Sequence, residues 1–74
     1  MTKLPVISGK NLVRLLIGLG FEIVRQKGSH ISMRKGKFRT VIPLQTELAK
    51  GTLLAILKQC GLEKDDLIKL LGGK

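Results

Sequence analysis

The segment that decides the fold is FEIVRQKGSHISMRKGKFRTVIP, residues 21–43. It holds three short runs rich in strand-forming residues, FEIVRQ, SHISMR and KFRTVIP, and a Lys-Gly pair stands at each junction between them. Glycine supplies the positive backbone φ that tight hairpin turns require. The segment therefore predicts a three-stranded antiparallel meander.

The middle run fixes which side chains face the protein interior. Successive side chains of a strand point to opposite faces, so Ile31 and Met33 share the apolar face. The opposite face carries three polar side chains: His30, Ser32 and Arg34. In the third run Val41 and Ile42 are adjacent, so alternation alone does not decide which of the two faces the core.

A helix is predicted before the sheet, in SGKNLVRLLIGLGF. Ser8 is a good N-cap and Gly20 a suitable C-terminal stop. Apolar residues recur at helical spacing between them: Leu12, Leu15, Leu16 and Leu19. Lys10 and Arg14 fall on the polar side of this helix.

Two further helices are predicted after the sheet. In GTLLAILKQCG, Leu53, Ile56, Leu57 and Cys60 recur at helical spacing and Gly61 closes the helix. The tail LEKDDLIKLLGGK gathers acidic residues at the start of a short final helix, whose docking stripe would be Leu67, Leu70 and Leu71. The order indicates an α+β fold in one domain, residues 1–74.

The charge balance bounds the function. Fourteen basic and five acidic residues give a formal charge of +9, which suits an anionic partner: nucleic acid, an acidic protein or an anionic membrane. No apolar run approaches the roughly 20 residues of a membrane-spanning helix, and the N-terminus lacks a signal-peptide layout. We expect a soluble, cytoplasmic protein without a membrane role.

Metal and thiol chemistry have little support in the sequence. One His, one distant Cys and few carboxylates offer no ligand set, so we expect no metal and no cofactor. Cys60 stands in an apolar helical run without a nearby base, which predicts core packing. We do not expect Ser29 to be a nucleophile activated by His30, because neighbours on a strand point to opposite faces.

The only histidine, His30, lies amid six of the fourteen basic residues, in a stretch without acidic residues (25–40). Attack by a ribose 2′-hydroxyl on its phosphodiester needs a proton acceptor, a proton donor and positive charge on the phosphorane. A His among Lys and Arg supplies these groups, and only RNA has the attacking hydroxyl. Candidate RNA contacts beside His30 are Arg25, Lys27, Gly28, Ser29, Ser32, Arg34, Lys35, Lys37 and Arg39.

Other interpretations of the same residues stay open. An exposed histidine on a strand is often a solvated surface residue, and a cationic face is often a nonspecific electrostatic footprint. A noncatalytic RNA-binding module would use the same basic face, and a protein-interaction domain would dock an acidic partner there. Because Phe21 and Phe38 are the only aromatic residues, contacts to RNA backbone and 2′-hydroxyls are favoured over base stacking on aromatic rings.

Several motifs resemble the HicA family of bacterial and archaeal mRNA-interferase toxins, over residues 8 to about 70. They are the Gly-Phe pair that closes the first helix, the triplet Gly28-Ser29-His30, and Gly51-Thr52-Leu53 before Ile56-Leu57-Lys58. The resemblance implies a fold like the double-stranded-RNA-binding domain, a three-stranded antiparallel sheet with helices on one face.

The resemblance also implies an activity and partners. It implies a toxin of a toxin-antitoxin system, an endoribonuclease that cleaves mRNA and inhibits translation, with His30 as the catalytic residue and a HicB-type antitoxin that blocks the site. Many family members carry a second histidine two positions after the proline that ends the third strand. Here that position is Gln45, so another group would act with His30; Lys27, Arg34 and Lys37 are the candidates.

Overall fold

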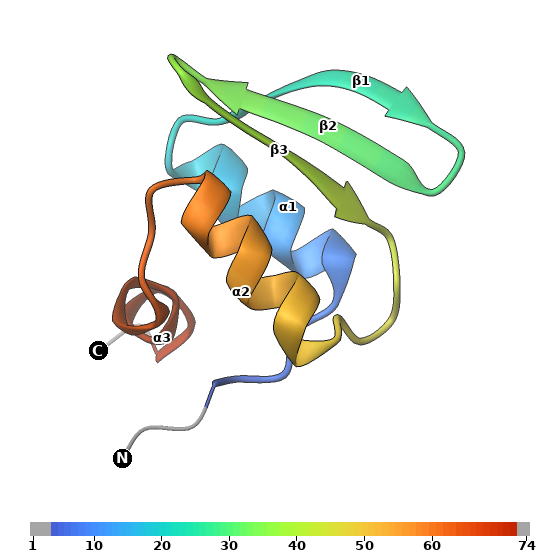
Figure 1. Ribbon diagram of the computed structural model, residues 1–74. Helices are drawn as coiled ribbons and strands as arrows, with labels where there is room; N and C mark the ends of the chain where they lie inside the picture. The colour runs from blue at the N-terminus through green and yellow to red at the C-terminus, as the bar shows by residue number, and fades with distance from the viewer. Residues whose placement is uncertain (1–3, 73–74) are drawn as a thin grey trace.

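A three-stranded antiparallel sheet covered on one face by helices forms the domain (Figure 1). The computed structural model describes residues 4–72. Its elements in chain order are α1 (Gly9–Gly18), β1 (Glu22–Lys27), β2 (His30–Lys35), β3 (Phe38–Pro43), α2 (Lys50–Gln59) and α3 (Lys64–Gly72). The strands follow the order β1-β2-β3, so β2 is central. The predicted α+β fold and element order are confirmed.

Both hairpins have two-residue turns that begin with a glycine. Gly28 and Gly36 have φ values of 59° and 58°, and no non-glycine residue in the described part of the chain has a positive φ. A positive φ followed by a negative one is the sign pattern of a type II′ turn, whose twist matches that of the flanking strands. The two Lys-Gly junctions thereby fix the register, which pairs Lys27 with His30 and Lys35 with Phe38.

The inner face of the sheet carries the buried side chains. Ile31 and Met33 are buried while His30 is exposed, which confirms the alternation predicted for the middle strand. In β3 the buried residues are Thr40 and Ile42. This settles the question that Val41 and Ile42 raised as sequence neighbours, because Val41 lies on the outer face.

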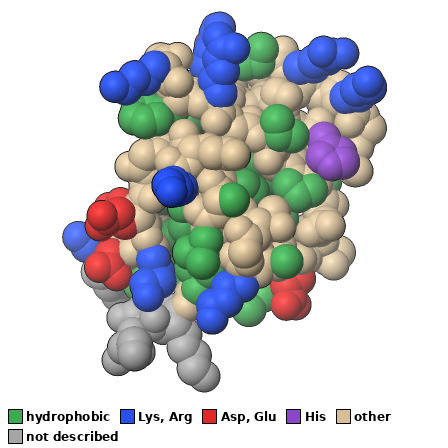
Figure 2. Space-filling model, in the orientation of Figure 1, with side chains coloured by type: hydrophobic (Ala, Val, Ile, Leu, Met, Phe, Trp, Pro, Cys, Tyr) green, Lys and Arg blue, Asp and Glu red, His purple; other side chains and the backbone are tan. Residues whose placement is uncertain are grey.

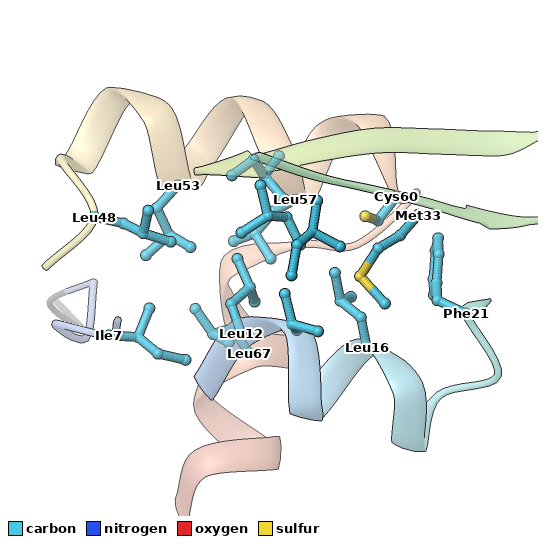
Figure 3. Close-up of a cluster of buried hydrophobic side chains, with 14 residues drawn as sticks. Ile7, Leu12, Leu16, Phe21, Met33, Leu48, Leu53, Leu57, Cys60 and Leu67 are labelled. Atoms are coloured by element: carbon cyan, nitrogen blue, oxygen red, sulfur yellow. The ribbon is translucent and has the colours of Figure 1, made fainter. Parts of the chain in front are cut away.

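The core lies between this inner face and the helices. Figure 3 shows leucines of α1 and α2, among them Leu12, Leu16 and Leu57, converging on Met33 from the sheet. The one buried polar side chain of the described core, Thr40, donates its hydroxyl hydrogen to Gln59 Oε1 at 2.7 Å. That bond ties β3 to the end of α2, because an unpaired buried hydroxyl would be costly.

The helix ends agree with the sequence, and the final helix agrees in part. Ser8 Oγ accepts a hydrogen bond from the Asn11 N–H at 3.1 Å, the predicted N-cap. In α3 Leu67 is buried, but Leu71 is 42% exposed, so the expected docking stripe of α3 is narrower than predicted. None of the helices within residues 4–72 has the length and apolar character needed to cross a membrane.

Gly61 joins α2 to the tail, and its replacement should destabilise the fold. Its φ is 73°, and a Cβ there would lie 2.7 Å from the Phe38 ring. We expect Gly61→Ala to lower the free energy of unfolding by at least about 1–2 kcal/mol, the cost of the left-handed conformation for an L-residue. Urea unfolding measures this value.

Gly51→Ala is the matched control, because it makes the same change in α2 where nothing lies within 4 Å of the added carbon and φ is not positive. It should leave stability unchanged or raise it by up to about 1 kcal/mol. Equal destabilisation of both variants would contradict this account of Gly61.

Cys60 is buried in the core, as predicted, and should be chemically inert. Burial raises the pKa of its thiol from 9.0 to about 11, because the thiolate would lose its hydration. At pH 8 only about one thiol in a thousand is then ionised. We expect a thiol reagent to label the folded protein slowly at pH 8, faster as the pH rises toward 11, and rapidly once urea unfolds the chain. Fast labelling of the folded chain at pH 8 would contradict this burial.

Candidate functional site

The outward-facing side chains of the three strands form a grid, which we name the outer sheet face. The strand pairing arranges them in three rows that run across the sheet. The rows are Lys27, His30 and Pro43; Arg25, Ser32 and Val41; and Glu22, Arg34 and Arg39. Five of these nine positions are Lys, Arg or His, so the outer sheet face is strongly basic.

His30 begins β2 beside the first hairpin turn and is exposed. Its cross-strand partner on β1 is Lys27. Directly opposite residues have Cβ atoms roughly 4.5–5.5 Å apart, and diagonal ones such as Arg25 roughly 7–8 Å. The backbone here is anchored, because the Leu44 N–H donates to the Ser29 carbonyl at 2.7 Å. The imidazole therefore stands on a fixed strand end within reach of two cations.

The row farthest from His30, which consists of Glu22, Arg34 and Arg39, has part of its positive charge neutralised. Arg34 forms an ion pair with Glu22 at 2.9 Å, in which the Arg34 side chain is 43% exposed and the Glu22 side chain 65% exposed. Such exposed pairs contribute little to stability, and they compete with other anions for the guanidinium. Arg39 stands opposite Arg34 and has no such ion pair in the described chain. Next to this row a hollow of about 520 Å³ includes the exposed apolar side chains Val24 and Val41.

Lys35 and Lys37 lie apart from His30. Lys35 shares the inner side of β2 with Met33, and its Nζ lies 5.9 Å from the centre of the Phe21 ring. Lys37 lies in the second hairpin turn, with its Nζ 5.8 Å from the centre of the Phe38 ring. Lys35 lies five positions along β2 from His30, a distance of roughly 17 Å along the strand. The six predicted cations thus fall into a near pair, Arg25 and Lys27, and a far group.

The turn residues Gly28 and Ser29 shape the site through the backbone. A Cβ on Gly28 would meet nothing within 4 Å, so the turn conformation alone accounts for the glycine. The open space at Gly28 also leaves room for a ligand backbone. Ser29 contributes its carbonyl to the bond with Leu44, and none of the hydrogen bonds found within residues 4–72 links it to His30.

A second group of cations was not predicted from the sequence. Lys10 and Arg14 of α1 border a hollow of about 710 Å³ that also reaches Ile31, the neighbour of His30, and Gln45. Linear sequence gives no sign of this, because the two cations precede His30 by 20 and 16 positions. Only the packing of α1 against the end of β3 brings them to this end of the sheet.

The surface charge is unevenly distributed over the molecule. Figure 2 shows Lys and Arg side chains over the sheet and also over the helices, while the acidic side chains visible in this view lie only on the helical side. Within residues 4–72, no three His, Cys, Asp or Glu side chains come together in a way that could hold a metal ion. The site therefore offers one imidazole, several cations and a basic surface.

Comparison with known proteins gives one assignment. The family model described as HicA toxin of bacterial toxin-antitoxin matches residues 9–62, which include α1, the whole sheet and α2. Comparisons with curated proteins and with solved structures gave no match. The match covers well over half of the chain and contains His30 with all of the outer sheet face. The chain therefore belongs to the HicA toxin family of bacterial toxin-antitoxin systems.

Proposed function

We propose that this chain is a toxin that cleaves mRNA without a metal ion and so inhibits translation, with His30 as its catalytic acid/base. One observation carries the proposal: the single imidazole is exposed at a fixed strand end, directly opposite Lys27 on a basic face. Membership of a toxin family supports it. The substrate is cytoplasmic mRNA, and we place the protein in the same compartment.

The proposed reaction is transfer of the phosphoryl group to the neighbouring 2′-oxygen. His30 accepts the 2′-hydroxyl proton as that oxygen bonds to phosphorus. The bond from phosphorus to the 5′-oxygen breaks, and the 5′-oxygen takes up a proton. The products are a 2′,3′-cyclic phosphate and a 5′-hydroxyl. Cations stabilise the extra negative charge of the transition state.

Lys27 is the best-placed of the three candidate proton donors. It lies directly opposite His30, whereas Arg34 is four residues along β2 and paired with Glu22, and Lys37 lies in the other hairpin turn. An ammonium group also gives up a proton far more readily than a guanidinium. We therefore assign Lys27 as donor to the leaving oxygen. Arg25, Ser32 and Arg39 would hold the RNA backbone on either side.

A HicB-type antitoxin is the proposed protein partner. Val24 and Val41 are exposed apolar side chains that line the hollow of about 520 Å³ together with Arg34 and Arg39. Such a surface suits an acidic partner that buries the valines and pairs with the arginines. By covering the outer sheet face, this partner would also cover His30 and so block RNA.

Substitution of His30 tests catalysis. We expect His30→Ala to lower the rate of RNA cleavage by about 10²–10⁴-fold, the usual contribution of a general acid-base group. The variant should keep its fold and RNA affinity, because the exposed ring supports no packing. Cleavage of a defined mRNA is followed with a chelator present, and the product ends are identified. An all-deoxy strand of the same sequence should stay intact.

Two outcomes would overturn the enzyme proposal. One is RNA binding by the parent protein without cleavage, which would favour a noncatalytic RNA-binding module on the same face. The other is cleavage that survives His30→Ala undiminished.

The placement of the cations predicts a ranking of their contributions to RNA binding. Arg25→Gln and Lys27→Gln together should weaken binding and reduce the salt slope by about 0.7 for each phosphate that is no longer neutralised. Lys35→Gln is the control: it also removes a cation, but one on the inner side of β2 and near Phe21. Its salt slope should stay close to that of the parent. Equal weakening of RNA binding by the double variant and by Lys35→Gln would contradict the ranking.

A further inference from the structure

A second hollow lies at the end of the sheet where β2 begins. Its volume is about 710 Å³, within the range of small-molecule and cofactor sites. One wall comes from α1 and the other from the segment that follows β3, with Ile31 between them. Ile31 follows His30 directly in β2, but its side chain faces the helices while His30 faces outward, so the hollow and the imidazole lie at the same end of the sheet on opposite faces.

Backbone contacts hold these two walls together. The Gly9 N–H donates to the Gln45 carbonyl at 2.9 Å, and the Leu44 N–H donates to the Ser29 carbonyl at 2.7 Å. A side chain at Gly9 would collide with the Pro43 carbonyl, so α1 presses directly against the end of β3. The start of α1, the Ser29 turn and the segment at Gln45 are therefore held together by direct backbone contacts.

The lining residues divide into three chemical kinds. Val13, Ile31 and Leu44 are apolar, Gln45 and Thr46 carry an amide and a hydroxyl, and no acidic residue lines the hollow. Lys10 and Arg14 are exposed on α1 at positions i and i+4, so they project from one side of that helix. An apolar wall, a hydrogen-bonding edge and two cations match the base and the phosphate of a nucleotide.

We propose that this hollow binds one nucleotide of the RNA substrate, at the end of the sheet where His30 begins β2, with the RNA strand passing around that end. The base packs against Val13 and Leu44, Gln45 and Thr46 contact its edge, and Lys10 and Arg14 bind its phosphate. The proposal rests on the proposed function and adds to it a subsite that would set cleavage preference. The alternative occupant is an acidic protein segment, but carboxylates would leave the acceptor groups of Gln45 and Thr46 unused.

The subsite is tested by binding, independently of catalysis. A short RNA oligonucleotide with 2′-O-methyl groups has no attacking hydroxyl and cannot be cleaved by this route. Titrated into the ¹⁵N-labelled full chain, it should shift the amide signals of Arg14, Gln45 and Thr46 in the NMR spectrum, which also reports the fold. No shift at these residues would overturn the proposal, as would shifts caused by an acidic peptide and not by the RNA.

Variants sharpen the binding test. Lys10→Gln with Arg14→Gln should weaken oligonucleotide binding at least about tenfold, because neither side chain can then form a charge-assisted hydrogen bond with phosphate. Lys64→Gln with Lys69→Gln removes the same charge from exposed positions on α3 and should change binding less than about threefold. Equal effects of the two double variants on oligonucleotide binding would mean that Lys10 and Arg14 act only through nonspecific charge attraction, which would overturn the subsite.

Cleavage mapping separates this proposal from the proposed function. Gln45→Ala should change which nucleotides flank the cleaved bonds, because the amide that contacts the base edge is lost. If the parent cleaves RNA and Gln45→Ala gives the same cleavage map, the subsite is wrong and the nuclease stands. If the parent does not cleave but the oligonucleotide shifts Gln45 and Thr46 as expected, the nuclease is wrong and the subsite stands.

Discussion

The burial of Ile31 and Met33 against the helices is the constraint on which the rest of the structure depends. Side chains alternate along a strand, so burying these two forces His30 outward. A one-residue slip of register would exchange the faces, placing the imidazole in the core and Ile31 in solvent. The hydrophobic effect on one face thus determines the chemistry on the other, and the two glycine turns hold the register in which both are satisfied.

The sequence predicted the parts of the fold that follow from local physics. Glycine turns, the Ser8 cap and the alternation in β2 depend on residues close in sequence, and the structure agrees with them. The inward face of β3 could not be predicted, because Val41 and Ile42 suit a core equally and only packing against α2 decides between them. The irregular register of β1 near Ile23 likewise depends on its pairing with β2. The exposure of Leu71 reflects how little of α3 docks.

The candidate site was predictable in its centre and not at its edges. His30 and its cross-strand neighbour Lys27 belong to one hairpin, so alternation and turn length suffice to place them together. Lys35 was a candidate RNA contact because it is a cation close to His30 in sequence. It lies two residues after Met33 in β2, so alternation places it on the inner side of the sheet, away from the His30 side chain. Lys10 and Arg14 reach the end of the sheet where β2 begins only because α1 packs on the end of β3. That contact joins segments about 35 residues apart along the chain, and no local pattern encodes it.

The cations of the sheet serve the fold as well as the proposed chemistry. A three-stranded sheet leaves two edges, β1 and β3, whose free backbone groups could pair with another chain. Arg25, Lys27 and Arg39 stand on those edge strands, and charged edges oppose such pairing. The same charges raise the self-repulsion of a 74-residue chain with a formal charge of +9. An anionic ligand that binds only the folded state would relieve this repulsion and stabilise the fold by mass action. The proposed RNA substrate and antitoxin would both have this effect, and the stability of the chain would then be coupled to the occupancy of its basic face.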